Sequence, residues 1–349
     1  MINKSEKIKV GISIGDLNGI GMEIIIKTFK DTRMLDFCTP IIFGSSKIAS
    51  IHRKAIELQE FNFHNINTIL EVKANKVNLL NCWKEDVEVK FGEATAETGK
   101  YAFQSIKSAC DSLKAKEIDV LVTAPINKSS IKDKISDFVG HTEFLQGNFK
   151  GKSLMIMVSE IMKIAFVTGH IPLDQVKGAI NLEKIVLKTK QLNQSLISDF
   201  GIIKPKIAII GLNPHAGEEG MLGSEENKII IPAIKKLNED SIMAFGPYPA
   251  DSFFTTKNLS AFDGILSMYH DQGLTPFKTL SFMNGVNYTA GLEIIRTSPV
   301  HGTAIDIAGK SIANEQSFRE AVFMACDIYK KRAVFEEIMS NPLPYKTRK

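Results

Sequence analysis

Three histidines in this chain stand where a metal ion could bind. His170, His215 and His270 each follow a short apolar segment, and each lies in a loop marked by glycine or proline. Open α/β sheets bind ligands at the carboxyl ends of their strands, and divalent ions such as zinc accept neutral imidazole nitrogens as ligands. The histidines are far apart along the chain. Three interpretations therefore stay open: a site within one subunit, a site between two subunits, or ordinary structural roles.

A second group of residues suits an anion. Lys278, Asn287 and Arg296 are hydrogen-bond donors in a stretch with few other charges. An arginine can hold a carboxylate or phosphate through two parallel hydrogen bonds. His141 and Thr142 follow a glycine at the expected start of a helix, where free N–H groups and the positive end of the dipole favour an anion. The alternative for each residue alone is a capped helix or a surface cation.

A third group lies in the segment PVHGTAIDIAGK, residues 299–310. The segment contains His301 and Gly302 and is rich in small residues. Such a loop lets a planar group approach the backbone closely. An acid such as Asp306 can accept hydrogen bonds from a ribose diol and repel a 2′-phosphate. The alternative is an ordinary glycine-marked connection before the last helix.

Two glycine-rich segments resemble nucleotide-binding motifs without matching them. In GDLNGIG, residues 15–21, the order of the glycines differs from the dinucleotide fingerprint G-x-G-x-x-G. We expect a tight turn there, or a close approach to a ligand. GNFKGKS, residues 147–153, has the wrong glycine spacing for a P-loop and precedes a strand rather than a helix. We expect no P-loop there.

The elements that must position these residues alternate between apolar strands and amphipathic helices. Strands are expected at residues 8–14, 40–43, 118–123, 154–158, 163–168, 206–210, 242–245 and 264–268. Helices are expected at residues 97–116, 182–200, 224–238 with a kink at Pro232, and about 315 to about 339. This alternation predicts an α/β protein with mixed, largely parallel sheets flanked by helices. We expect two domains that share a continuous or bridging sheet.

The composition excludes several other classes of protein. The 349 residues are 44% hydrophobic and 23% charged with a net charge of +4, which excludes global disorder and argues against a nucleic-acid partner. No apolar run is long enough to span a membrane, and the polar N-terminus does not look like a signal peptide, so we expect a cytoplasmic protein. The four cysteines should be buried thiols, and His52 and His64 should lie in solvent.

Together these residues resemble a known enzyme family. From Gly11 to Lys310 the chain is similar, in the same order, to the 4-hydroxythreonine-4-phosphate dehydrogenases of vitamin B6 synthesis. The segments that carry the resemblance are GDLNGIGMEI, VTAPINK, GHTEF, TGHIPL, GLNPHAGE, GPYPADSFF, YHDQGLTPFK and GLEIIRTSPVHGTAIDIAG. The stretch HGTAIDIAGK also resembles the adenosine-binding loop of the isocitrate and isopropylmalate dehydrogenases.

The resemblance implies a fold and a reaction. The fold would be the two-domain isocitrate/isopropylmalate dehydrogenase-like fold with the active site in the interdomain cleft. Residues 1–140 and 300–349 would form a terminal domain, and residues 141–299 a central domain that contributes metal ligands and dimer contacts. The reaction would be NAD-dependent oxidation of 4-phosphooxy-L-threonine at C3 to 2-amino-3-oxo-4-phosphooxybutanoate, which decarboxylates to 3-amino-2-oxopropyl phosphate. The partner would be a second copy, in a homodimer with interfacial active sites.

Two other functions stay open. Sister enzymes of this family oxidise D-threonate or D-erythronate 4-phosphate. From another class, a metal-dependent hydrolase or phosphotransferase would also use histidines and phosphate-binding groups.

The resemblance also implies residue roles. His170, His215 and His270 match the ligands of one divalent metal ion (Zn, Mg or Co) per subunit, drawn from one or both chains. The implied substrate-binding residues are His141, Thr142, Lys278, Asn287 and Arg296. The implied nucleotide-binding residues are His301, Gly302 and Asp306, of which Asp306 favours NAD over NADP.

Three residues are candidates for proton transfer. Lys278 is the first candidate for donating or accepting the proton of the reacting hydroxyl group. Asp251 and Asp271 are rival bases, or partners that orient the histidines.

The chain departs from the family pattern in two places. Leu17, Asn18 and Met22 stand where the family usually has Pro, Ala and Pro, and we expect altered stiffness of this loop rather than lost activity. After Gly291 the chain reads Leu-Glu-Ile-Ile where the family often has Leu-Pro-Phe-Ile. This second departure leaves the substrate open among four-carbon phosphorylated hydroxy acids.

Overall fold

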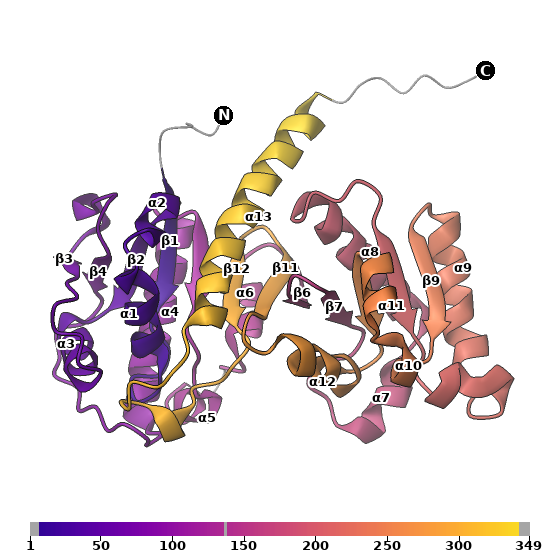
Figure 1. The fold of residues 1–349 in the computed structure, drawn as a ribbon, viewed down its shortest axis with the longest axis horizontal. Helices are drawn as coiled ribbons and strands as arrows, with labels where there is room; N and C mark the ends of the chain where they lie inside the picture. Colours follow the sequence, from indigo (N-terminus) through magenta and orange to yellow (C-terminus); the bar gives the residue numbers. More distant parts are fainter. Residues whose placement is uncertain (1–6, 136–137, 342–349) are drawn as a thin grey trace.

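One sheet of twelve strands runs through the described part of the protein (Figure 1). The structure is a computed structural model that describes residues 7–135 and 138–341. In spatial order the strands are β3 (His64–Ile66), β4 (Asn78–Asn81), β2 (Cys38–Gly44), β1 (Ile8–Ser13), β5 (Val120–Thr123), β12 (Arg296–Pro299), β11 (Val286–Leu292), β6 (Gly151–Val158), β7 (Lys163–Phe166), β10 (Gly264–Ser267), β8 (Lys206–Ile210) and β9 (Met243–Tyr248). The predicted α/β class and the continuous sheet are confirmed. The two domain boundaries stay a prediction.

The strand directions change in the middle of the sheet. The strands from β3 to β12 are paired in parallel, and so are β7, β10, β8 and β9. Between these two halves, β11 is antiparallel to β12 and to β6, and β6 is antiparallel to β7. The two parallel halves therefore run in opposite directions, with β12, β11 and β6 joining them.

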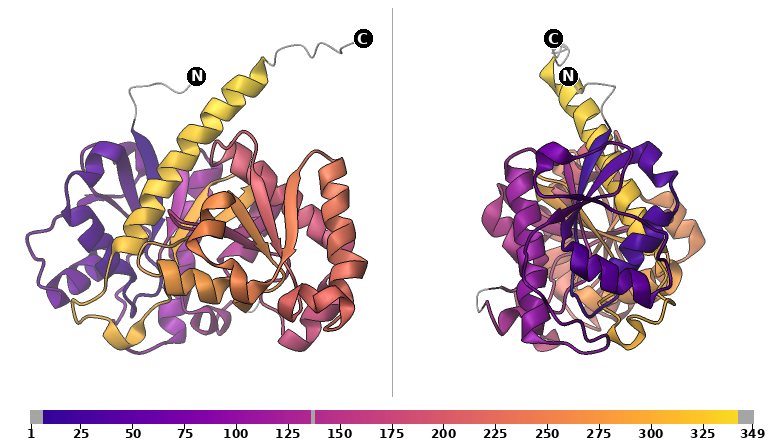
Figure 2. Two further views of the ribbon diagram at one scale, coloured as in Figure 1. Left: turned by 45° about the vertical axis from the view of Figure 1, so that its right-hand side comes forward. Right: turned by 90° about the vertical axis from the view of Figure 1, so that its left-hand side faces the viewer.

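Helices cover both faces of the sheet (Figure 2). Thr95 and Asn181 cap the two long helices α4 and α8, because each side chain accepts a hydrogen bond from an N–H of the first turn. The helices are α1 (Gly21–Lys30), α2 (Met34–Phe37), α3 (Ser46–Ala55), α4 (Ala96–Lys114), α5 (Lys128–Lys132), α6 (His141–Asn148), α7 (Leu173–Ala179), α8 (Leu182–Ser198), α9 (Ile231–Glu239), α10 (Ala250–Phe253), α11 (Thr256–Ala261), α12 (His270–Ser281) and α13 (Gln316–Ser340). Shorter helical turns are η1 (Ile69–Glu71), η2 (Pro214–Gly220), η3 (Glu226–Ile230) and η4 (Ile305–Ile307).

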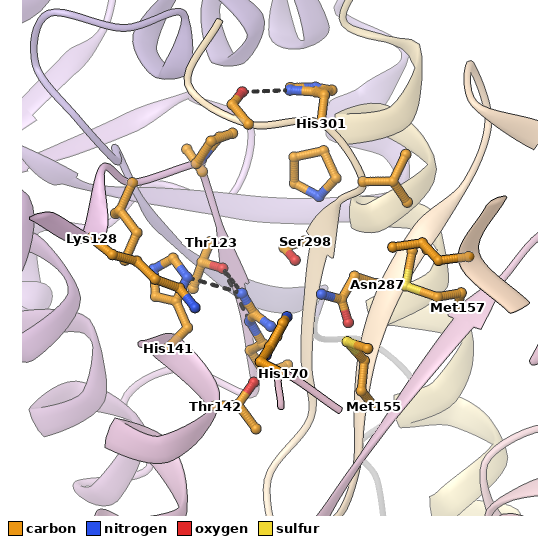
Figure 3. A pocket seen from close by; sticks show the side chains of 18 of the residues that line it. Thr123, Lys128, His141, Thr142, Met155, Met157, His170, Asn287, Ser298 and His301 are labelled. Carbon is orange, nitrogen blue, oxygen red and sulfur yellow. Dashed lines mark hydrogen bonds between the residues drawn. The ribbon is translucent and has the colours of Figure 1, made fainter. Parts of the chain in front are cut away.

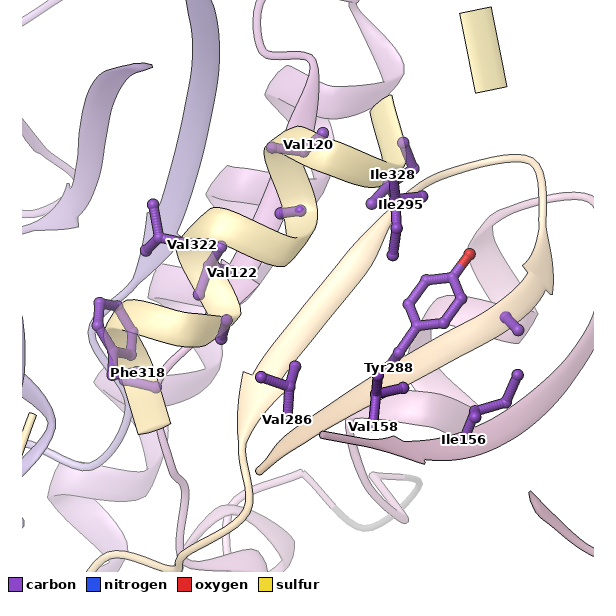
Figure 4. Packing of buried hydrophobic residues seen from close by; sticks show 14 of the residues in the cluster. Val120, Val122, Ile156, Val158, Val286, Tyr288, Ile295, Phe318, Val322 and Ile328 are labelled. Atoms are coloured by element: carbon purple, nitrogen blue, oxygen red, sulfur yellow. The ribbon is translucent and has the colours of Figure 1, made fainter. Parts of the chain in front are cut away.

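The three central strands have one apolar face, which packs against α13 and α8 (Figure 4). Side chains alternate along a strand, so every second residue of these strands points to this side. The buried residues of this contact include Ile156, Val158, Val286, Tyr288, Ile295, Phe318, Val322 and Ile328. The intervening residues point to the opposite face, where the cavity described below is found.

A buried ionic network links α13 to these strands. The Asp199 carboxylate, 2% exposed, accepts hydrogen bonds from Arg332 Nε and Tyr288 Oη, both at 2.7 Å. Arg332 also donates to Tyr288 Oη (2.8 Å) and to the carbonyls of Leu292 and Ile294 (both 3.2 Å). The position of α13 therefore depends on charged groups as well as on apolar contact.

The structure differs from the sequence-based expectation in several elements. The sequence pattern does not predict β3, β4, β11 and β12. The last two carry Asn287 and Arg296 and mix polar with apolar residues at buried positions, which hides the strand pattern. The expected helix at residues 224–238 is the π-helical turn η3 followed by α9, so Pro232 lies in the first turn of α9 rather than at a kink.

The expectation that His52 lies in solvent is wrong. Its side chain is 1% exposed, its Nε2 lies 2.8 Å from the Leu17 carbonyl oxygen, and its ring packs edge-on against Phe91. Burial lowers the pKa of His52 to about 4. His64 is partly exposed.

The cysteine prediction is confirmed in most respects. All four cysteines are free thiols, of which Cys38, Cys110 and Cys326 are buried and Cys82 is partly buried. Within residues 7–135 and 138–341, no helix has both the length and the apolar character needed to cross a bilayer.

Replacing Arg332 with methionine should lower the free energy of unfolding by about 3 kcal/mol, because the buried Asp199 carboxylate would lose its cationic partner. Urea unfolding followed by circular dichroism measures this change. Arg33→Met is the control, since Arg33 pairs with Asp31 at the exposed surface and should leave the midpoint nearly unchanged. Equal midpoints for Arg332→Met and wild type would contradict the role of the network.

His52 should make the protein less stable in mild acid. Its pKa is about 4 when folded, against 6.5 in the unfolded chain, so the unfolded state binds the extra proton first. Stability is complete above pH 6.5 and is lost as the pH falls toward 4, by about 2 kcal/mol at pH 5. Urea unfolding at pH 7.5 and at pH 5 should show a smaller loss for His52→Gln, which can donate to Leu17 but does not titrate. The same loss in both proteins would refute this assignment.

Candidate active site

The polar face of β12, β11 and β6 forms one wall of a cavity (Figure 3). Met155, Met157, Asn287, Arg296 and Ser298 point to this side because they alternate with the core residues that face α13. The end of β5 and the start of α6 border the cavity, as does α12. Its volume is about 370 Å³, within the range of small-molecule sites, roughly 300–1,000 Å³.

Arg296 is the most deeply buried charge in this wall. Its guanidinium donates to Thr123 Oγ1 (2.6 and 3.0 Å), to Thr289 Oγ1 (3.1 Å) and to His141 Nδ1 (3.2 Å). Burial lowers the pKa of Arg296 to about 10, so it stays charged at neutral pH. These contacts hold a cation that has no carboxylate hydrogen-bonded to it among the described residues.

His141 is neutral at the start of α6. Burial, followed by the nearby charges of Arg296 and Lys128, lowers its pKa well below the ordinary value. Because Nδ1 accepts the hydrogen bond from Arg296, the ring proton lies on Nε2, which has no hydrogen-bond partner among the described residues. His141, Thr142 and the first N–H groups of α6 thus supply donors beside the arginine.

Two further polar groups of the cavity lining have no partner within the described chain. They are Asn287 Oδ1 and His301 Nε2. His301 Nδ1 donates to the Gly302 carbonyl (3.0 Å), so the neutral ring keeps a lone pair on Nε2. Burial lowers the pKa of His301, and the charge of Lys278 adds to this effect. Unpaired buried polar groups are rare in folded proteins, and a ligand is one thing that pairs them.

The cavity is cationic. Lys128, Lys278 and Arg296 line it, and Glu143 is the single acidic residue among the described lining residues. Such a balance favours a ligand with one or more negative groups.

His170 and His270 both line the cavity and lie next to each other. Their ring centroids are 5.1 Å apart. His270 Nδ1 lies 2.6 Å from Asp271 Oδ1, which leaves its Nε2 free to bind a ligand. Burial lowers the pKa of His170, with Lys128 adding repulsion, so its imidazole is neutral at pH 7.

His215 lies apart from this pair. Its side chain is 64% exposed in the loop after β8, does not line the cavity, and has Nδ1 3.9 Å from Asp251 Oδ2. In residues 7–135 and 138–341, no three histidine, cysteine or acidic side chains cluster as metal ligands. One chain therefore brings together two of the three predicted metal ligands, and the third lies outside the cavity lining.

The structure places the predicted nucleotide loop partly at the cavity. His301 and Gly302 line it, whereas Asp306 lies in η4, exposed and outside the lining. Around Gly302 the space is open, since an added Cβ would meet no atom within 4 Å. The Ile20 N–H donates to the Thr303 carbonyl (3.1 Å), so the first glycine-rich loop supports the loop at residues 301–306.

Asn18, one of the departures from the family pattern, joins the first glycine-rich loop to residues 90–93. Its Oδ1 accepts the Lys90 N–H (2.9 Å) and its Nδ2 donates to the Glu93 carbonyl (2.8 Å). An alanine could make neither hydrogen bond. Glu293, from the second departure, lies outside the cavity lining. Its backbone N–H donates to the Lys150 carbonyl, and its Oε1 accepts the Lys150 N–H.

Sequence reasoning missed several lining residues. Thr123 orients Arg296, Ser298 lies two positions along β12, and Lys128 begins α5. Thr123 and Lys128 both lie in VTAPINK, a segment that carried the resemblance, so that motif was the available signal.

Comparisons with known proteins agree with this picture. Residues 36–325 match the model of the family described as Pyridoxal phosphate biosynthetic protein PdxA. The chain is 48% identical over 343 residues to the 4-hydroxythreonine-4-phosphate dehydrogenase of Bacteroides thetaiotaomicron, covering 97% of this chain and 94% of that protein. It is 36% identical over 329 residues (93% and 98%) to a protein of Oceanobacillus iheyensis whose name refers to D-threonate 4-phosphate.

A solved structure confirms the fold. The crystal structure of 4-hydroxythreonine-4-phosphate dehydrogenase from Klebsiella pneumoniae matches with a TM-score of 0.77 at 31% identity, covering 94% of this chain and 99% of that one.

Replacing Arg296 with methionine should weaken binding of inorganic phosphate at least tenfold, because charge-assisted hydrogen bonds worth about 1.5–3 kcal/mol would be lost. Isothermal titration calorimetry measures the affinity, and circular dichroism checks that the variant is folded. Arg33→Met removes an exposed arginine and should bind phosphate as wild type does. A folded Arg296→Met protein with unchanged affinity would show that the anion binds elsewhere.

Proposed function

The chain belongs to the pyridoxal phosphate biosynthetic protein PdxA family, and from this membership we propose that it oxidises 4-phosphooxy-L-threonine at C3 with NAD as hydride acceptor. The product, 2-amino-3-oxo-4-phosphooxybutanoate, is a β-keto acid that loses CO2 to give 3-amino-2-oxopropyl phosphate. The observation that carries the proposal is the buried Arg296 cation beside a neutral His141, in a cavity of suitable size.

The phosphate end of this substrate suits the donors around Arg296. A phosphate dianion gains from a fixed guanidinium and from the N–H groups that open α6. His141 Nε2 has a proton to donate, and Thr142 lies next to it in the cavity lining. Lys278 and Asn287 line the same cavity and are available to the substrate's carboxylate and amino group.

The loop at residues 301–306 supports a nucleotide cofactor. His301 and the open space at Gly302 border the cavity in which hydride transfer would take place. Asp306 is exposed, as an acceptor for a ribose diol must be, and its charge disfavours the 2′-phosphate of NADP. NAD would supply the hydride acceptor, and the loop would hold it against the cavity.

The histidines fit one divalent ion (Zn, Mg or Co) per subunit if two copies of the chain combine. His170 and His270 are neighbours, and among the described residues His270 Nε2 and the His170 ring have no hydrogen-bond partner. His215 is exposed in a separate loop. We infer a homodimer in which His215 of one copy completes the site of the other. A divalent ion there would stabilise the negative charge that develops on the C3 oxygen and during loss of CO2.

The three candidates for proton transfer have different surroundings. Asp271 is hydrogen-bonded to His270 Nδ1, which suits a residue that orients the His270 ring. Asp251 lies beside His215 and outside the cavity lining. Lys278 lines the cavity, so we assign to it the transfer of the proton of the substrate hydroxyl group.

D-threonate 4-phosphate is the second candidate substrate, because a relative's name refers to it. It differs from the first at C2, where a hydroxyl group replaces the amino group. Glu293, where the chain departs from the family pattern, does not favour D-threonate 4-phosphate, since that residue lies outside the cavity lining.

The direct test is NADH formation with each substrate. We expect 4-phosphooxy-L-threonine to be oxidised with a kcat/KM at least tenfold above that of D-threonate 4-phosphate, and a chelator to abolish the activity until a divalent ion is restored. The opposite preference would assign the sister activity. Phosphate release without NADH would point to a hydrolase instead.

Asp306→Asn should lower the preference for NAD over NADP about tenfold, because the charge that repels a 2′-phosphate is removed. The ratio of kcat/KM for the two cofactors measures it. Glu315→Gln is the control, because it removes a carboxylate nine residues further along the chain, at the N-cap of α13 and outside the predicted nucleotide loop. An unchanged ratio would mean that the nucleotide loop is misassigned.

A further inference from the structure

The loop that carries His215 has a left-handed backbone. Residues 215–219 have φ values of 51°, 52°, 82°, 41° and 55° in succession. Only glycine adopts this region readily, and only Gly217 among the five is a glycine. Such a backbone persists where the surroundings impose it, and it is concentrated at functional sites.

The side chain of Glu226 supplies that constraint. It is 2% exposed, and its Oε1 accepts the N–H groups of Leu212 (2.8 Å) and Asn213 (2.7 Å). Its Oε2 accepts a hydrogen bond from Asn213 Nδ2 (2.8 Å). Within the described chain Glu226 forms no ion pair, so its charge is held entirely by donors at the base of the loop.

The fit between Glu226 and the loop leaves no spare room. A Cβ added to Gly217 would lie 2.7 Å from Glu226 Oε2, and one added to Gly211 would lie 3.3 Å from Oε1. Glu226 begins the π-helical turn η3, a rare element that is frequent at functional sites. The π turn aims this carboxylate at the loop.

The base of the same loop is tied to the element that carries His270. Gln272 Nε2 donates to the Gly211 carbonyl (2.6 Å), and Gln272 Oε1 accepts the Met268 N–H (2.8 Å). The loops that carry His215 and His270 therefore have a fixed relation at their bases, while the His215 side chain is exposed.

We propose that Glu226 is a positioning residue, which holds the left-handed loop so that His215 is presented outward to a metal ion. The inference rests on the proposed metal site. Without the carboxylate, the loop would relax toward right-handed backbone and His215 would lose its direction. Glutamine cannot replace it, because in either orientation its amide N–H₂ faces donors, either Asn213 Nδ2 or the two backbone N–H groups.

The test uses full-length protein and Co²⁺ alone as the probe. Glu226→Gln should bind Co²⁺ at least tenfold more weakly by calorimetry and change its visible absorption, and amide exchange at residues 212–219 should become faster even without metal. Glu218→Gln removes a charge from an exposed position of the same loop and should behave as wild type. Wild-type Co²⁺ affinity in Glu226→Gln would overturn the proposal.

Two further variants separate positioning from general destabilisation. Ala216→Gly relieves the left-handed strain and should restore part of the Co²⁺ affinity in the Glu226→Gln background, whereas Gly217→Ala alone should reproduce the Glu226→Gln effect. If Ala216→Gly and Glu226→Gln are each folded but the double variant binds Co²⁺ no better than Glu226→Gln, the positioning role is overturned. Separately, a His215→Ala protein with wild-type Co²⁺ affinity would overturn the proposed metal site, and the role of Glu226 with it.

Discussion

Side chains alternate between the two faces of a strand, and in β12, β11 and β6 this alternation separates a hydrophobic core from a polar cavity. One face packs against α13, while the other carries Asn287 and Arg296. A shift of one residue in the pairing would bury the guanidinium in the core and turn core side chains into the cavity. The network of Asp199, Tyr288 and Arg332 holds α13 against the apolar face.

The cavity combines a permanently charged arginine with neutral histidines. Arg296 is paired with hydroxyl groups and a ring nitrogen rather than with a carboxylate, so its charge is available to an anion. His141 is kept neutral by burial and by that same charge. In the proposed function the cation would hold the phosphate, and the neutral nitrogen atoms would bind a metal ion or donate hydrogen bonds.

Much of the site could be predicted from the sequence. The rest could not be predicted, and the reasons are physical. The strand-end placement of His170 and His270 predicts that they could meet, and the structure brings them together. The sequence does not predict that β7 and β10 run opposite to β5, because the direction in which strands pair leaves no trace in the apolar pattern. β11 and β12 escape prediction because the residues that alternate with their core positions, among them Asn287 and Arg296, are polar and face the cavity.

His52 and Lys128 illustrate two other limits. A buried histidine on an amphipathic helix looks like a surface residue until the segment that covers it is known, here the Leu17 loop. Lys128 lies in a motif, but only the fold shows that the start of α5 borders the cavity.

Mixing of subunits tests most directly whether the active site is built from two copies around this wall. His170→Ala and His215→Ala proteins should each be inactive, and a mixture refolded together should regain about a quarter of wild-type activity, because each mixed dimer keeps one complete site. A mixture of His170→Ala with His270→Ala should stay inactive, since those two ligands come from the same chain. No recovery in the first mixture, or equal recovery in both, would contradict the account.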